Sequence, residues 1–181
     1  MFDYVREPAG IYEQSFATIE AEADLARFDA LERAVAVRLI HACGMVDVVE
    51  DVEISPGAAK AGHAALASGA AIVCDVEMVR HGIIAARLKA GNAVHCFLRD
   101  PAARAEADRL DTTLSAGAIE AARDVLPGSV VVIGNAPTAL FRLLEMVEEG
   151  MEPPAIVIGI PVGFVGAIES KQALAAHSSN V

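Results

Sequence analysis

The stretch SVVVIGNAPTALFRLLEMVEEG, residues 129–150, decides the fold class of this chain. It begins with a short, continuous apolar run, which is typical of a strand that is covered on both faces. Apolar side chains then repeat with helical spacing, at Leu140, Leu143, Leu144 and Val147, up to a closing glycine. A strand followed directly by a helix is the repeating element of an α/β fold.

Three other short apolar runs bounded by Gly, Pro or Asp match the first part of this stretch. They are AAIVCDV (70–76), AVHCFL (93–98) and AIVIGIPV (155–162), and helical patterns lie between them. Because strand and helix alternate, we predict an α/β chain with a three-layer, doubly wound and mainly parallel sheet. The length of 181 residues fits a single domain spanning residues 1–181.

The segment before the first predicted strand has a helical pattern. Apolar spacing predicts two helices within the first 42 residues, the second of which ends at Gly44, and we expect both to pack on the sheet. Ser55 and Pro56 have the residue types of a helix N-cap and first position, so a third helix is expected from there to Gly69.

Composition limits the partners. The chain has 14 Lys+Arg against 25 Asp+Glu, a net charge of −11, which repels nucleic acid and anionic membrane surfaces. The longest nearly uncharged run, 155–168, is too short to span a bilayer. Three irregularly spaced cysteines (Cys43, Cys74 and Cys96) indicate a reducing compartment, and we expect a cytoplasmic protein.

Ligands of parallel α/β sheets bind beyond the carboxyl ends of the strands. The segments 75–82, 134–138 and 159–166 are therefore candidates for a binding site. In GNAPT (134–138), the backbone N–H groups of Gly134 and Asn135 stand at a predicted helix N-terminus and could face an anion. The alternative is an ordinary capped turn.

His41 ends the apolar helical segment VRLIHACG, where the negative end of the helix dipole favours an imidazolium. This suits a general acid near neutral pH, and the alternative is a histidine that caps helix carbonyls. A metal site is not expected, because His95 and Cys96 are neighbours on a predicted strand and point to opposite faces.

Five stretches, in order, carry a resemblance to a known family: IYEQSFATIEAEADL, RLIHACGMVD, VCDVEMVRHGI, GSVVVIGNAPTALFRLLEM and GIPVGFVGAIESK. Together they resemble the precorrin-8X methylmutase (precorrin isomerase) family of cobalamin biosynthesis. The resemblance implies a flavodoxin-like fold and an isomerase that moves a methyl group from C11 to C12 of precorrin-8X to give hydrogenobyrinate, with no added cofactor. It also implies a homodimer with its active site near the interface, to which the edge strand at 155–162 would be suited.

The resemblance assigns roles to individual residues. His41 stands at the position of the family's catalytic histidine, which donates a proton to the macrocycle and so eases the methyl shift. Ser15 stands at the position of a serine that contacts the substrate. The resemblance also favours the ligand-binding interpretation of GNAPT, and thus substrate binding at Gly134 and Asn135.

Three features depart from the family's pattern. Leu114 stands where the family carries an arginine, and Ile84 stands where a threonine or serine is expected, both at substrate-binding positions. Family members continue beyond Val181, so we expect this chain to lack their C-terminal strand and helix. These departures keep a second hypothesis open, a protein that binds a corrin or other tetrapyrrole without converting it. A flavin-binding domain is a third.

Overall fold

The computed structural model describes Phe2 and residues 4–177, and the chain forms two compact units that divide between residues 59 and 60. Each unit is described by itself. The single domain over residues 1–181 and the packing of the N-terminal helices on the sheet therefore stay predictions. The expected loss of a C-terminal strand and helix concerns residues beyond those described.

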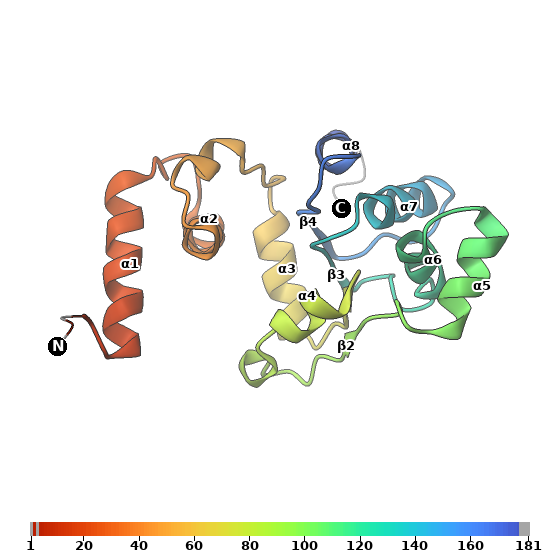
Figure 1. Cartoon of the computed structure of the whole chain (residues 1–181), viewed down its shortest axis with the longest axis horizontal. Coiled ribbons are helices and arrows are strands. Elements are labelled where there is room, and N and C mark those ends of the chain that lie inside the picture. The colour runs from red at the N-terminus through yellow and green to blue at the C-terminus, as the bar shows by residue number, and fades with distance from the viewer. Residues whose placement is uncertain (1, 3, 178–181) are drawn as a thin grey trace. The chain divides into compact units, whose positions relative to one another are not determined.

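The first unit is helical, with α1 (Pro8–Glu22), α2 (Ala30–Cys43) and the short 3₁₀ helix η1 (Asp47–Asp51) (Figure 1). The side chain of Asp29 accepts hydrogen bonds from the first N–H groups of α2, and the Glu32 carboxylate accepts from the Asp29 N–H. Gly44, with φ of 70°, ends α2. The prediction of two helices ending at Gly44 is confirmed.

The first unit has a small core of its own. Its buried apolar residues are Ile19, Leu25, Ala36, Val37, Ile40 and Val49. The Arg27 guanidinium donates hydrogen bonds to the carbonyl oxygens of Val49 and Val52, which holds the segment after α2 in place. This core fixes the α1 and α2 side chains relative to one another.

The helix that leads into the second unit, α3 (Ala58–Ala67), begins later than predicted. Pro56 and Gly57 form a turn, and Gly57 has a φ of 83°, outside the helical region. Ser55 supplies its backbone carbonyl to the Ala58 N–H at 2.9 Å and is not the residue before the helix. The predicted start at Ser55 and Pro56 is therefore wrong, whereas Gly69, with φ of 87°, follows the helix end as expected.

Each predicted apolar run contains a strand of one sheet. The strands are β1 (Ile72–Cys74), β2 (Val94–His95), β3 (Val130–Ile133) and β4 (Ile156–Gly159), in the order β2-β1-β3-β4. All three pairings are parallel, which confirms the prediction of an α/β chain with a parallel sheet. The remaining helical segments are α4 (Glu77–Gly82), η2 (Ala85–Arg87), α5 (Pro101–Leu110), α6 (Leu114–Ala121), α7 (Pro137–Glu148) and α8 (Ala167–Ala176).

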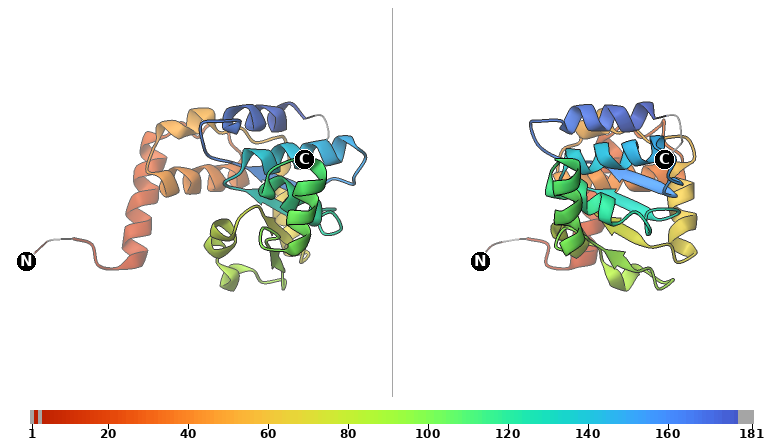
Figure 2. Two further views of the ribbon diagram at one scale, coloured as in Figure 1. Left: turned by 45° about the vertical axis from the view of Figure 1, so that its right-hand side comes forward. Right: turned by 90° about the vertical axis from the view of Figure 1, so that its right-hand side faces the viewer.

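The two faces of the sheet carry different clusters, because side chains alternate along each strand. Val73, Val131 and Val157 pack with buried side chains of α6 and α7. Ile72 and Val130 point the other way and pack with α3. Helices therefore lie on both faces, as the two views of Figure 2 show, and the middle strands β1 and β3 are the most buried.

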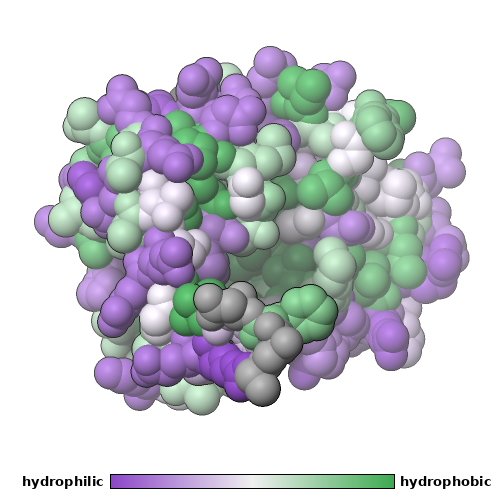
Figure 3. Space-filling view, turned by 60° about the vertical axis from the view of Figure 1, so that its left-hand side comes forward, coloured by the Kyte–Doolittle hydropathy of each residue, from purple (hydrophilic) through white to green (hydrophobic). Residues whose placement is uncertain are grey.

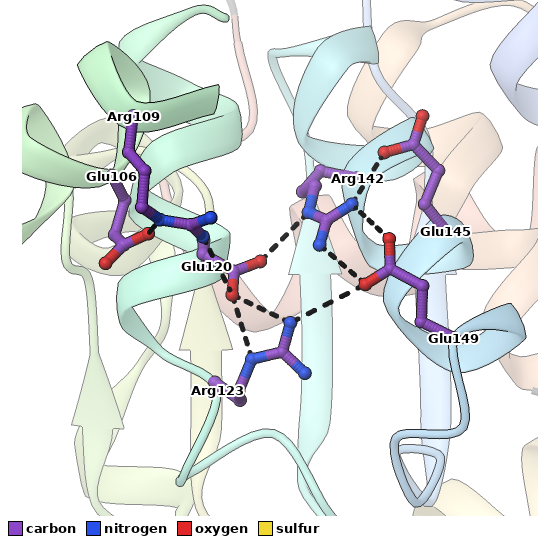
Figure 4. A network of polar contacts seen from close by, with 7 residues as sticks. All are labelled: Glu106, Arg109, Glu120, Arg123, Arg142, Glu145 and Glu149. Atoms are coloured by element: carbon purple, nitrogen blue, oxygen red, sulfur yellow. Dashed lines mark hydrogen bonds and ion pairs between the residues drawn. The ribbon is translucent and has the colours of Figure 1, made fainter. Parts of the chain in front are cut away.

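An ion-pair network joins α6 to α7 (Figure 4). Glu120, only 8% exposed, accepts hydrogen bonds from the guanidinium groups of Arg123 and Arg142 at 2.8 and 2.9 Å. Arg142 also pairs with Glu145 and Glu149. Burial opposes the charge of Glu120, but the two arginines outweigh it, and the pKa of Glu120 lies below its ordinary value.

Candidate functional site

The structure brings together Ser15 and His41, two of the residues predicted for the site. Ser15 lies in the middle of α1 and His41 in the last turn of α2, and the Ser15 Oγ is 2.7 Å from His41 Nδ1. Both side chains are half-buried. The hydrogen bond therefore fixes one ring nitrogen, while no hydrogen bond to Nε2 is found among the described residues.

Two aromatic rings of α1 contact the His41 ring. The centroid of Tyr12 and that of Phe16 each lie 5.3 Å from it, Phe16 edge-on at 87° and Tyr12 tilted at 39°. Tyr12, Ser15 and Phe16 share one face of α1, because residues three and four apart lie one above the other. The sequence analysis missed both aromatic residues, although their helical spacing around Ser15 was the signal that could have found them.

A hollow of about 470 Å³ adjoins this pair within the first unit. Its lining is mixed, with apolar side chains (Ile11, Ile19, Ile40 and Val46) and polar ones (Gln14, Ser15, Thr18, Glu22 and His41). The volume is within the range of small-molecule sites. The hollow thus places a ligand-sized space beside an acid–base group.

The alternative role of His41, capping the carbonyl groups of its helix, does not match the contacts. The Gly44 N–H donates to the Ile40 carbonyl oxygen at 2.8 Å, so a glycine provides the cap. Nδ1 of His41 is engaged with Ser15 instead. His41 is therefore held by α1 and not by the carbonyl groups of its own helix.

The turn GNAPT differs from the prediction. The N–H groups of Gly134, Asn135 and Ala136 donate to the carboxylate of Asp75 at 3.1, 2.9 and 2.8 Å. Asp75 is 1% exposed and comes from the end of β1. The expectation that the Gly134 and Asn135 N–H groups face an external anion is wrong, because a carboxylate of the chain already occupies them. The Asn135 side chain remains exposed.

The two positions that depart from the family pattern also lie in the second unit. Leu114 is the first residue of α6 and is half-buried beside Thr113, whose hydroxyl is 2.8 Å from that of Thr138 at the start of α7. Ile84 lies between α4 and η2 and is 54% exposed. Ile84 follows β1 along the chain, and Leu114 follows β2 and α5. Among the described residues predicted for the site, Ser15 and His41 are the pair that a side-chain hydrogen bond joins.

The described part of the chain contains no group of three or more His, Cys, Asp or Glu side chains that could hold a metal ion. Of the basic side chains near the carboxyl ends of the strands, Arg80 is paired with Glu77 at 3.1 Å. Within residues 4–177, no helix has both the length and the apolar character to cross a bilayer.

Fold and site define a class: an α/β protein with a parallel sheet that also presents a half-buried serine–histidine pair beside a ligand-sized hollow. Comparison with known proteins identifies the family within this class. The family model "Precorrin-8X methylmutase" matches residues 10–181. The chain belongs to the precorrin-8X methylmutase family, isomerases of cobalamin biosynthesis.

Individual relatives agree with this assignment. The chain is 58% identical over 181 residues to a precorrin-8X methylmutase of Pseudomonas aeruginosa, covering 100% of this chain and 87% of that protein. It is 38% identical over 167 residues to a cobalt-precorrin-8 methylmutase of Leptospira interrogans, covering 91% and 76%. The crystal structure of precorrin-8x methyl mutase from Thermus thermophilus superimposes with a TM-score of 0.82 at 37% identity, over 92% of this chain and 81% of that one.

Proposed function

We propose that the chain moves a methyl group from C11 to C12 of precorrin-8X, giving hydrogenobyrinate, with His41 as the proton donor and acceptor. The observation that carries this proposal is the Ser15–His41 pair, in which one ring nitrogen is held and the other is left for a ligand. The 58% identity to a protein named precorrin-8X methylmutase supports the choice of substrate.

Proton transfer from His41 would ease the migration of the methyl group within the ring. A proton added to a conjugated macrocycle withdraws π-electron density toward the protonated atom, which eases a 1,5-shift of the methyl with its bonding electrons. Return of the proton to His41 after the shift leaves substrate and product with the same atoms. Histidine suits both steps because it is the side chain that ordinarily titrates near neutral pH.

We propose that no cofactor takes part, and the net reaction consumes no co-substrate. No atom is gained or lost, and no electrons are transferred between substrate and enzyme. The protein has to bind the ring, deliver one proton and take it back. A positioned acid–base group contributes on the order of 10² to 10⁴ in rate to such a step.

Substrate binding is proposed for Ile84, Leu114, Gly134 and Asn135 in the second unit. Because the Gly134 and Asn135 N–H groups are bonded to Asp75, Asn135 would bind through its exposed side-chain amide. Gly134 would shape the turn, since a Cβ there would lie 2.7 Å from the Val79 side chain. Leu114 and Ile84 offer only apolar contact.

The direct test is to incubate the purified chain with precorrin-8X and follow the absorption spectrum. The proposal expects catalytic conversion to the spectrum of hydrogenobyrinate. Tight binding without a spectral change would support a corrin-binding protein instead. A flavin spectrum in the protein as purified would support a flavin-binding domain.

We further propose that the fold is the doubly wound, three-layer, flavodoxin-like type. The order β2-β1-β3-β4 matches the first four strands of that fold, whose strand order reverses between β1 and β3. Helices on both faces of the sheet support the same assignment. The single domain over residues 1–181 is kept as part of this proposal.

A homodimer is proposed on the basis of exposed apolar side chains. β4 is an edge strand, and Ile158 in it is 40% exposed. Val162, Phe164 and Val165, which follow it, are 60%, 108% and 89% exposed. In the space-filling view of Figure 3, hydrophobic side chains are exposed among hydrophilic ones. Light scattering should give twice the chain mass, and a monomer at micromolar concentration would contradict the proposal.

A cytoplasmic location is proposed from the cysteines. Cys43, Cys74 and Cys96 are all free thiols. Burial, with a smaller effect of the neighbouring Cys96, raises the pKa of the Cys74 thiol to about 12. Free thiols are maintained in a reducing compartment, and this supports a cytoplasmic location.

A further inference from the structure

We propose that Ser15 is a positioning residue, whose hydroxyl keeps the proton of neutral His41 on Nδ1 so that Nε2 is the atom that exchanges a proton with the substrate. The inference rests on the proposed function and deepens it, because it names the reacting atom. It also changes the role of Ser15 from contact with the substrate to control of the histidine.

The contacts of the His41 ring fix its orientation. The Ser15 Oγ lies 2.7 Å from Nδ1, a short hydrogen bond between two half-buried side chains. Tyr12 and Phe16 contact the same ring at 5.3 Å each and limit its rotation. A ring held at one nitrogen and by two aromatic neighbours presents its other nitrogen in one direction.

The hydrogen bond between Nδ1 and the Ser15 Oγ can persist in both charge states of His41. In the imidazolium both nitrogens bear hydrogen, so Nδ1–H must donate to Ser15 Oγ. After Nε2 has given its proton to the substrate, the same Nδ1–H···Oγ bond persists without any rotation of the hydroxyl. Nε2 then has a free lone pair and can take the proton back, which the opposite tautomer could not do.

A serine is suited to this task because it is neutral. A carboxylate at this place would hold the proton on the histidine more strongly and oppose its transfer to the substrate. A hydroxyl can accept from Nδ1–H and orient the ring without adding a charge that favours the imidazolium. The first unit thus contains an imidazole that is oriented by a neutral partner.

The position of the proton can be measured without substrate. In ¹⁵N NMR of histidine-labelled protein, with His41→Gln identifying the His41 signals among the five histidines, neutral His41 should show the Nδ1–H tautomer. Ser15→Ala should shift the signals toward the Nε2–H tautomer, whereas the control Ser68→Ala should not, because the Ser68 hydroxyl donates to the Ala65 carbonyl oxygen in the last turn of α3. An Nε2–H tautomer in the parent, or no shift in Ser15→Ala, would overturn the inference.

Kinetics separate positioning from substrate contact. Ser15→Ala should lower kcat on the order of 10- to 100-fold, the effect of losing one hydrogen bond to a charged group, with KM little changed. Ser15→Thr should restore most of the rate, because it returns a hydroxyl. A raised KM with unchanged kcat would overturn the inference in favour of substrate contact. A parent protein that does not turn over at all would refute the proposed function, while the NMR result would still decide the place of the proton.

Discussion

The two units of this chain use buried polar groups in opposite ways. In the second unit, the carboxylate of Asp75 accepts three backbone N–H groups, and that of Glu120 is surrounded by arginines. In the first unit, the half-buried His41 has one ring nitrogen bonded to Ser15, and its other ring nitrogen makes no hydrogen bond with residues 4–177. Charge that is fully paired stabilises a fold, whereas a group with an unused position can act on a ligand.

This difference predicts where substitutions act. Changes at Asp75 or Glu120 should lower the free energy of unfolding, and changes at His41 should lower turnover with little effect on folding. Among effects on stability and binding, the expected size falls from Asp75 through Arg142 and Leu114 to the acid sensitivity of Glu120, and a reversed result would weaken the comparison.

The largest effect is expected for Asp75→Ala. The substitution leaves three N–H groups at the turn before α7 without their acceptor, and Ala136 among them is buried. An unsatisfied buried donor costs about 1–3 kcal/mol, so the free energy of unfolding should fall by roughly 3–5 kcal/mol in denaturant titration. The exposed Asp124→Ala is the matched control and should change it by less than about 0.5 kcal/mol. A loss for Asp75→Ala no larger than that of the control would show that the turn does not depend on this carboxylate.

The ion-pair network allows a sharper test. Arg142→Met removes one partner of buried Glu120, and we expect a loss of roughly 2–3 kcal/mol, since Arg123 still pairs with the carboxylate. The double variant Glu120→Leu with Arg142→Met removes the charge as well and should recover most of that loss. Additive losses in the denaturant titrations would contradict the view that the cost comes from an unpaired buried charge.

The fold was predictable where local pattern decides it. Each of the four apolar runs contains a strand, and Gly44 and Gly69 end their helices as expected, because a left-handed φ favours glycine. The start of α3 was not predictable in this way: Ser55 and Pro56 have capping chemistry, but the left-handed Gly57 delays the helix to Ala58.

The contacts of the candidate site could not be predicted from local pattern. His41 and Ser15 were both named as candidates, Ser15 from the resemblance alone, but their hydrogen bond joins positions 26 residues apart, which no local pattern reveals. The same holds for Asp75, whose carboxylate reaches a turn about 60 residues later. Sequence reasoning counted the N–H groups of that turn as open to a ligand because the partner that fills them lies on another strand.

A gain of binding is expected in the second unit. Leu114 supplies no hydrogen bond, and an arginine there could pair with a substrate carboxylate. One such charge-assisted bond contributes on the order of 1.5–3 kcal/mol, so Leu114→Arg should tighten binding of hydrogenobyrinate by about 10- to 100-fold in titration. Unchanged or weaker affinity would show that Leu114 serves only as an apolar contact at the start of α6.

The smallest expected effect is a loss of stability at acidic pH. The pKa of Glu120 is lowered in the folded chain, so its pairing stabilises the fold above the ordinary glutamate value of about 4.5 and is lost as the pH falls through the lowered pKa. The free energy of unfolding should therefore decline below pH 4.5, and less steeply in the Glu120→Leu, Arg142→Met double variant. An equally steep decline in that variant would assign the acid sensitivity to other carboxylates.

The most direct test of the account is turnover of precorrin-8X by His41→Ala, measured with its affinity for hydrogenobyrinate and its free energy of unfolding. The account predicts that kcat falls by about 10² to 10⁴, while product binding and stability stay near those of the parent. His63→Ala, an exposed histidine of α3, should retain the parent rate and serves as the control. Turnover at the parent rate by His41→Ala would contradict the account, because the proton would then come from another group.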